Sequence, residues 1–210
     1  MKFEYAIIVK NKTRLETLVE RYNTRAQARF YIESLGGSFE DYEVEHENFH
    51  AALVQVQTSL SRQIKNKTVD RQYLPSYIFS ASNLIIVLGQ DGLVANTAKY
   101  SNGCPMIAVN PDVTRYDGVL LPFTIADFML GVEQVMQGKA TLKTARLAEA
   151  QLNNGQRLLA FNDLFIGAAS HVSARYTIEY KGKTEDQSSS GFIVSTAAGA
   201  TGWLSSVFNM

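Results

Sequence analysis

A glycine-rich turn that carries one carboxylate is the stretch of this sequence best suited to chemistry. It reads Gly89-Gln90-Asp91-Gly92 and directly follows the apolar run 84–88, which has no polar alternation and is typical of a strand buried on both faces. Residues 93–100 favour a helix, so backbone N–H groups at its start can face a phosphorylated ligand, which glycines let approach closely. Because Asp91 repels phosphate, it suits a different role, such as taking a proton from a hydroxyl, holding a metal or capping the helix.

Two further stretches carry polar groups that can bind a ligand. Asn162-Asp163 pairs an amide with a carboxylate, which together donate and accept and so suit a sugar diol or a nucleobase edge. The same pair is also common in loops and Asx turns. Residues 195–203 read Ser-Thr-Ala-Ala-Gly-Ala-Thr-Gly-Trp and offer backbone N–H groups and hydroxyls beside one aromatic ring, although a simple strand-to-helix connection has the same composition.

Other reactive residues have plainer interpretations. His46 and His50 are four residues apart, a spacing that places both on one helix face. Two histidines without a third ligand define no metal site, so we expect the solvated start of a helix. Cys104 is expected to be buried and not a nucleophile. Asp112 and Asp117 follow the carboxyl end of a predicted strand, where open α/β sheets bind ligands, and suit turns equally well.

Composition narrows the class of protein. The chain has 210 residues, of which 46% are hydrophobic, enough for one large domain or two small ones. Its 20 basic and 20 acidic residues cancel, which argues against a nucleic-acid partner or a membrane surface. The single cysteine excludes an intramolecular disulfide framework, and the sequence shows neither a signal-peptide pattern nor a long apolar run. We therefore expect a cytoplasmic protein.

The first 140 residues alternate between strand and helix patterns. Strands are expected at 3–9, 39–44, 84–88 and 106–109, and helices at 13–36, 48–64, 93–100 and 124–138. The first helix begins with a capping box at Thr13 and Glu16. Residues 65–75 are polar and are expected to form an exposed loop. This order predicts an α/β domain over 1–140, with a parallel sheet and flanking helices.

The pattern changes near residue 140 to short strands. Asn153-Asn154-Gly155 predicts a hairpin between 142–152 and 156–161. Apolar and polar residues alternate over 172–180, which predicts a half-buried strand, while 183–190 is polar and 192–195 is strand-like. Residues 141–210 are therefore predicted to form a β-rich domain, a partial β-sandwich. Because four or five short strands leave a sandwich incomplete, we expect the chain to be a fragment of a longer protein.

The order of these stretches resembles the NAD kinase family. That family has a Gly-Gly-Asp-Gly-Thr loop after a buried strand, then Gly-Ile-Asn, then Asn-Glu in a β domain, then Thr-Pro-Thr-Gly-Ser-Thr-Ala-Tyr. The corresponding stretches here are Gly-Gln-Asp-Gly-Leu at 89–93, Ala-Val-Asn at 108–110, Asn162-Asp163, and residues 196–203. The resemblance spans roughly residues 83–205. Residues 110–123 are similar to a divergent bacterial branch of the family that is sometimes labelled sugar kinase.

The resemblance implies a reaction and assigns roles. Asp91 would take the proton from the 2′-hydroxyl of the NAD adenosine ribose, which attacks the terminal phosphoryl group of ATP or polyphosphate with Mg²⁺ present. Gly89 and Gly92 would present backbone amides to the phosphates. Nucleotide-binding roles follow by resemblance for further residues: Gln90, Asn110 and Gly199, Asn162 and Asp163 at the adenine–ribose part of NAD, and Thr196, Thr201 and Trp203 at the adenine. No metal-ligating side chain is assigned, and a homo-oligomer assembled through the β domain is implied.

The departures from the family pattern leave other functions open. Gln90 replaces the second glycine, and Leu93 replaces a threonine whose hydroxyl could contact phosphate. Residues 197–202 lack the proline and several hydroxyls of the family motif. One alternative is a catalytically inactive nucleotide-binding or regulatory protein on the same fold. Another is a related kinase with a lipid or sugar acceptor, since lipid kinases of the diacylglycerol type share a similar loop, although Asn162-Asp163 favours a nucleoside acceptor.

Overall fold

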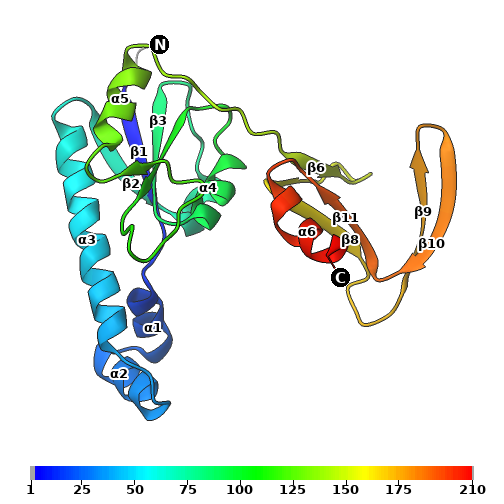
Figure 1. Ribbon diagram of the computed structural model, residues 1–210, viewed down its shortest axis with the longest axis horizontal. Helices are drawn as coiled ribbons and strands as arrows, with labels where there is room; N and C mark the ends of the chain where they lie inside the picture. Colours follow the sequence, from blue (N-terminus) through cyan, green and yellow to red (C-terminus); the bar gives the residue numbers. More distant parts are fainter. Residues whose placement is uncertain (1–2, 210) are drawn as a thin grey trace. The chain divides into compact units, whose positions relative to one another are not determined.

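A parallel sheet of five strands forms the centre of the first of two units, Met1–Leu142 and Lys143–Met210 (Figure 1). The computed structural model describes residues 3–209. The sheet has the order β2-β1-β3-β4-β5, and every neighbouring pair is parallel. Its strands are β1 (Tyr5–Lys10), β2 (Lys65–Asp70), β3 (Asn83–Leu88), β4 (Met106–Asn110) and β5 (Phe123–Thr124). The predicted α/β domain followed by a β-rich region is thus confirmed.

Helices cover both faces of this sheet. Alternate residues of β1 and β3 enter two separate cores, and all six residues of β3 are buried. One core lies against α3 (Glu40–Ser61) and α5 (Phe128–Met136), and the other against α4 (Asp91–Ala98) and the 3₁₀ helix η1 (Arg71–Ser76). Cys104 is 9% exposed in the second core, where burial raises the pKa of its thiol, as expected for an unreactive cysteine.

The remaining helices form a small lobe of their own. Helices α1 (Arg14–Tyr22) and α2 (Arg25–Ser34) pack with the start of α3 around Leu15, Ala28 and Phe39. The predicted capping box is confirmed, because Thr13 and Glu16 exchange both hydrogen bonds. One continuous helix over 13–36 was the wrong prediction, since Asn23 adopts a left-handed φ of 64° that ends α1 and Thr24 caps α2.

Two other predicted elements of the first unit are wrong. Residues 39–44 are not a strand but the start of α3, because Glu40, Asp41 and Glu43 suit the positive end of a helix. Residues 65–75 are not a loop but β2 and η1. Polar strands such as β2 are tolerated at the edge of a sheet, where Lys65 and Lys67 are exposed.

The second unit consists of three antiparallel strand pairs and a short helix. The pairs join β6 (Ala148–Gln151) with β7 (Arg157–Ala160), β8 (Asp163–Gly167) with β11 (Gly191–Ser195), and β9 (Ala174–Tyr180) with β10 (Lys183–Ser189). The predicted Asn-Gly hairpin is confirmed between β6 and β7, whereas residues 142–147 of its first predicted strand lie outside any strand. The chain continues through η2 (Gly199–Thr201) into α6 (Trp203–Phe208).

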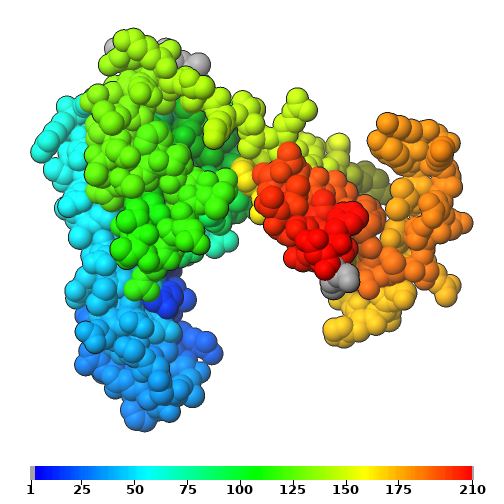
Figure 2. Space-filling view, in the orientation of Figure 1, coloured from blue at the N-terminus to red at the C-terminus, as the bar shows by residue number. Residues whose placement is uncertain are grey.

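The β9–β10 hairpin differs from the prediction in two ways. In β9 (orange in Figure 2), Ala174 and Tyr176 are partly buried as predicted, whereas Ile178 at 37% and Tyr180 at 67% are exposed, so only the first half of the strand is half-buried. The polar run 183–190 forms its partner strand, helped by cross-strand bonds such as that from the Thr177 hydroxyl to Asp186, 2.7 Å.

Within residues 3–209, no helix is both apolar and long enough to cross a bilayer.

Candidate functional site

The candidate residues of the first unit lie at the carboxyl edge of the sheet. The chain passes from β1 to β2 on one side, whereas β3 pairs with β1 on the other, so the strand order reverses between β1 and β3. Ligands of open α/β sheets bind outside the carboxyl ends of the strands at such a reversal. The glycine-rich turn, residues 89–92, follows β3 at this place, and Asn11 and Lys12 follow β1.

The two glycines of the turn have different surroundings. A Cβ atom on Gly89 would lie 2.9 Å from Cδ2 of Leu93, which is 4% exposed and part of the core. At Gly92, by contrast, nothing lies within 4 Å of the Cβ position. Gln90 precedes α4 and does not cap it with its side chain. The backbone at Gly92 and the start of α4 is therefore open to an anionic group.

Asp91 is held by the loop that follows β4. Its Oδ1 accepts a hydrogen bond from the N–H of Leu120, 2.7 Å, and its Oδ2 accepts one from the N–H of Val119, 3.2 Å. Each carboxylate oxygen has a second lone pair, so both can still accept a hydrogen bond from a ligand. The carboxylate is thus fixed in orientation and keeps lone pairs that can face a ligand.

Asn110 supports the same loop from the end of β4. It is 5% exposed; its Oδ1 accepts from the N–H of Asp112, 2.9 Å, and its Nδ2 donates to the carbonyl of Tyr116, 2.9 Å. The hydroxyl of Thr114, 2.6 Å from Asp112, lowers the pKa of that carboxyl group. Asp112 therefore forms a turn, one of the two roles open to it. Asp91 and Asn110 hold one loop, residues 111–121, from two sides.

A polar hollow at the same edge contains residues that the sequence did not single out. It has a volume of about 370 Å³ and is lined by Asn11, Lys12, Asp70, Arg71, Gln72, Pro75, Asn96 and Tyr100. Lys12 pairs with Glu20, whose hydrogen bond raises the pKa of the lysine, and Lys10 forms an ion pair with Asp70 at 2.7 Å. Their position could have identified three of these residues, because Asn11, Lys12 and Arg71 directly follow strands of the parallel sheet.

In the second unit, the structure brings two sequence motifs together. The Thr196 hydroxyl donates to the carbonyl of Phe161, 2.6 Å, and the Thr196 N–H donates to the carbonyl of Asn162, 2.9 Å. Gly199 is buried directly against this backbone, since a Cβ atom there would lie 2.4 Å from the Asn162 carbonyl oxygen. The cause is the register of β8 and β11, which pairs Asp163 with Ser195.

The remaining predicted residues of this unit differ in environment. Oδ1 of Asp163 is buried near Gly199 and has no hydrogen-bond partner in the described part of the chain. Trp203 packs against Phe165 of β8, with ring centroids 5.5 Å apart, and remains 49% exposed. Thr201 ends η2 and is exposed. The group around Asp91 belongs to the first unit, and the group around Thr196 belongs to the second.

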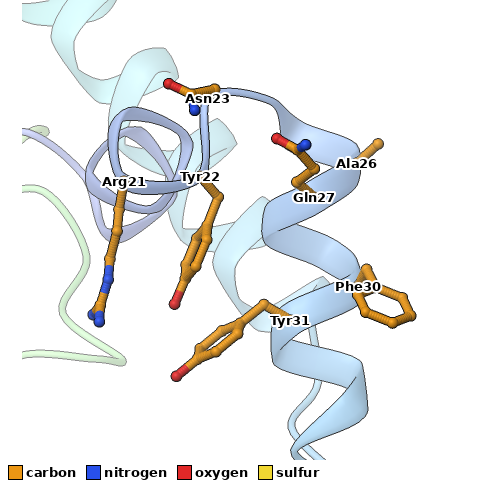
Figure 3. Close-up of a pocket in the computed structure, with 7 residues that line it drawn as sticks. All are labelled: Arg21, Tyr22, Asn23, Ala26, Gln27, Phe30 and Tyr31. Carbon is orange, nitrogen blue, oxygen red and sulfur yellow. The ribbon is translucent and has the colours of Figure 1, made fainter.

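A second hollow, of about 580 Å³, lies away from all predicted site residues. Figure 3 shows its lining by α1 and α2 residues, with the ring of Tyr22 facing that of Tyr31 and Phe30 turned outward. The Tyr22 and Tyr31 rings stack with centroids 4.5 Å apart, and Phe30 is 75% exposed. The hollow is open and mostly apolar, and it contains no carboxylate, so it is a poor match to a phosphoryl-transfer site.

Comparison with known proteins supports the fold. No protein-family model and no curated protein sequence matches this chain. Among solved structures, the chain is similar to yeast NADH kinase complexed with NADH, with a TM-score of 0.53 and 15% sequence identity. The match covers 98% of this chain and 61% of the yeast protein. This chain therefore has an NAD kinase-like two-domain fold and spans less than two thirds of that kinase.

Proposed function

We propose that this protein is an NAD kinase-like phosphotransferase that moves a phosphoryl group from ATP or polyphosphate to the 2′-hydroxyl of the NAD adenosine ribose. The observation that carries the proposal is the position of Asp91. It lies in a glycine-rich turn at the strand-order reversal of a doubly wound sheet, and two backbone N–H groups orient its carboxylate. The neighbour in structure is itself a kinase complexed with NADH.

The chemistry assigned to the first unit is proton transfer and charge stabilisation. Asp91 takes the proton of the ribose hydroxyl as that oxygen forms a bond to the terminal phosphorus, and the bond from this phosphorus to the departing phosphate breaks. The open backbone at Gly92 and the start of α4 faces the phosphates. Mg²⁺ would neutralise phosphate charge in this reaction and would be held through the phosphates of the donor, with no side chain of this chain assigned to it.

The second unit is assigned the nucleoside part of NAD. Asn162 is exposed, and its amide can donate to and accept from ribose hydroxyls or the adenine edge. Beside it, Oδ1 of Asp163 has no hydrogen-bond donor among residues 3–209, which leaves this carboxylate available for a polar partner if Gly199 shifts. Trp203 supplies an exposed aromatic face on which an adenine can stack. Assembly through this unit into a homo-oligomer belongs to the same proposal by resemblance to the family, and a cytoplasmic location belongs to it from the single cysteine and the sequence pattern of the N-terminus.

One observation favours a second candidate, a nucleotide-binding protein without phosphoryl transfer. Leu93 is buried over Gly89, so the turn has no hydroxyl where the family has a threonine. A missing phosphate contact weakens transition-state stabilisation more than it weakens binding of the nucleoside. A kinase acting on a lipid or sugar acceptor is the third candidate. Such a kinase would convert ATP to ADP when its acceptor is added, so ADP release can detect it.

The test is an assay of NADP formation. The full chain is incubated with NAD, Mg²⁺ and either ATP or polyphosphate, and NADP is measured with an NADP-specific dehydrogenase, with ADP release recorded in parallel. Binding is followed separately through the fluorescence of Trp203, the single tryptophan of the chain, which reports on the second unit. Asp91→Asn is compared with Asp41→Asn, which changes an exposed carboxylate on α3.

We expect NADP formation by the wild type and by Asp41→Asn, and a loss of at least about a hundredfold in Asp91→Asn with NAD still quenching Trp203. Fluorescence quenching by NAD without NADP from either donor would contradict phosphoryl transfer to NAD and support the nucleotide-binding alternative. ADP release that depends on an added lipid or sugar would support the third candidate. A chain that neither binds NAD nor makes NADP would contradict both of the first two.

A further inference from the structure

Three potential metal ligands from two helices meet in the helical lobe. Glu16 lies on α1, and His46 and His50 lie four residues apart on one face of α3. One ligand atom from each of the three lies within 4.8 Å of the other two. The imidazole rings have centroids 4.3 Å apart, and Nε2 of His50 is 3.1 Å from Oε1 of Glu16. The histidine pair alone had lacked a third ligand, and the fold supplies one from 30 residues upstream.

Thr13 positions two of these three side chains. Its N–H donates to Oε2 of Glu16, 2.8 Å, and its hydroxyl is 2.9 Å from Nδ1 of His46. Thr13 is 4% exposed and caps α1 through the same hydroxyl, which accepts from the N–H of Glu16. Neighbouring groups that fix the orientation of a ligand in this way are typical of metal sites. Oε1 of Glu16 is left to face His50.

We propose that Glu16, His46 and His50 form a binding site for a divalent transition metal of the Zn²⁺ class. Two imidazoles and one carboxylate are a known three-ligand set for Zn²⁺, which leaves a fourth position for water or another small ligand. Tetrahedral coordination needs ligand atoms about 3.3 Å apart, as follows from metal–ligand bonds of about 2.0–2.1 Å. The distance between Nε2 of His50 and Oε1 of Glu16 is already close to this value. Rotation of the half-exposed side chains can bring the ligand atom of His46 to the same distance from the other two.

The site is open to solvent and joins two helices. The His50 and Glu16 side chains are 38% and 29% exposed, so solvent and ions reach them. Lys10 of β1 and Arg25 of α2 lie near enough to influence Glu16 and His46, and Glu47 of α3 offsets them. A bound metal would join α1 to α3 across the small core around Leu15 and Phe39. This site belongs to the first unit and is independent of the proposed kinase reaction.

The experiment uses the metal alone as the probe. The purified chain is treated with a chelator, dialysed, and titrated with Zn²⁺ by calorimetry and with Co²⁺ by visible absorption, and its melting temperature is recorded with and without Zn²⁺. Glu16→Gln is the sharpest variant because glutamine also completes a capping box and so keeps α1 capped without the carboxylate. His50→Gln is the second variant. His171→Gln is the matched control, since it removes the only other histidine of the chain, which is exposed in the second unit.

We expect one Zn²⁺ per chain, a tetrahedral Co²⁺ spectrum, and a melting temperature that rises with Zn²⁺. Affinity should fall by at least about tenfold in Glu16→Gln and in His50→Gln and stay unchanged in His171→Gln. Circular dichroism of the metal-free variants checks that α1 and α3 still form. The proposal is overturned if the wild type binds no Zn²⁺, or if folded Glu16→Gln and His50→Gln bind it as tightly as the wild type does.

Discussion

At the scale of single residues, Gly92 allows backbone access to be tested apart from folding. Because nothing lies within 4 Å of its Cβ position, Gly92→Ala introduces no clash. Alanine is favoured over glycine in a helix by about 0.5–1 kcal/mol, so we expect the free energy of unfolding to stay equal or to rise by up to that amount. If phosphates approach this backbone, the added methyl group should raise the KM for the phosphoryl donor by about tenfold. Urea unfolding and donor-dependent kinetics measure the two effects, and an unchanged KM would place the phosphates elsewhere.

At Gly199, an added methyl group is expected to lower the stability instead. Its added Cβ atom would lie 2.4 Å from the carbonyl oxygen of Asn162 and 2.8 Å from Oδ1 of Asp163, so the backbone must shift. We expect Gly199→Ala to lower the stability of the second unit by about 1–3 kcal/mol, the usual cost of overpacking. Trp203 fluorescence during urea unfolding reports this unit, and Gly92→Ala is the control in the first. Equal midpoints for Gly199→Ala and the wild type would mean that the two motifs do not pack as described.

Some residues of the candidate sites could be predicted from residue types and short spacings, and the others depend on contacts between residues distant in sequence. Gly89 and Asp91 could be singled out because the turn, the strand and the helix are contiguous. The N–H groups of Val119 and Leu120 that hold Asp91 could not, because backbone donors have no sequence signature. Glu16 was identified only as part of a capping box, since nothing in the sequence indicates that α1 lies beside α3 at His50.

At the scale of elements, the loop 111–121 depends on the buried side chain of Asn110. Asn110→Ala would leave the carbonyl of Tyr116 and the N–H of Asp112 without their partner. We expect a loss of about 1–3 kcal/mol in the free energy of unfolding and faster amide hydrogen exchange over the loop. Asn48→Ala is the control, because it removes only an exposed contact to Asp112 at 3.5 Å. Equal exchange rates in Asn110→Ala and the wild type would show that other contacts hold the loop.

The pairing of α1 with α3 should depend on pH. Burial, followed by the charge of His50, lowers the pKa of His46 below its ordinary value of 6.5. Although burial alone would raise it, the Thr13 N–H and the charges of Lys10 and His50 lower the pKa of Glu16. In both cases the unfolded chain binds the proton more tightly than the folded chain does. Each group therefore contributes its full stabilisation above its ordinary pKa, and this contribution is lost as the pH falls through the lowered pKa of the folded state.

For His46 this loss begins as the pH falls below 6.5. We therefore expect the metal-free protein to be less stable at about pH 5.5 than at about pH 7.5. His46→Gln should reduce this difference, because glutamine does not titrate, whereas His171→Gln should preserve it. Urea unfolding at the two pH values, in the presence of a chelator, measures the effect. An identical pH dependence in His46→Gln and the wild type would contradict it.

Element types were predictable where hydrophobic periodicity was strong and failed where tertiary packing decides. β3, α4 and the Asn-Gly hairpin follow from local pattern and turn chemistry alone. The break between α1 and α2 was hidden, since residues 13–36 keep helical spacing across Asn23, and only its left-handed backbone separates the two helices. β2 was hidden because an edge strand buries little, so its polar sequence 65–70 carries no periodic signal.

At the scale of the whole molecule, the change in hydrophobic pattern near residue 140 follows from how each half of the chain buries its core. The first unit covers both faces of a parallel sheet with helices, from α4 with 8 residues to α3 with 22, which gives helical periodicity between its strands. The second unit is made of short antiparallel pairs, which give short alternating runs and turn residues. Composition and pattern therefore distinguish the two halves, whereas the pairing of β8 with β11 depends on contacts that no local pattern indicates.

An exposed segment connects the two units. Residues 141–146 are exposed and lie outside any helix or strand, and Lys143 and Arg146 are trypsin sites within them. Extended, exposed segments of this kind are nicked first in limited proteolysis, because the protease must bind an unfolded stretch of backbone. We expect early fragments that end at these two residues by mass spectrometry and slower cleavage in the double variant Lys143→Gln, Arg146→Gln. First cleavage at Lys181 in the β9–β10 turn, or at Lys183 at the start of β10, would instead identify the hairpin as the less stable segment, because a protease selects the stretch that opens at the lowest free energy.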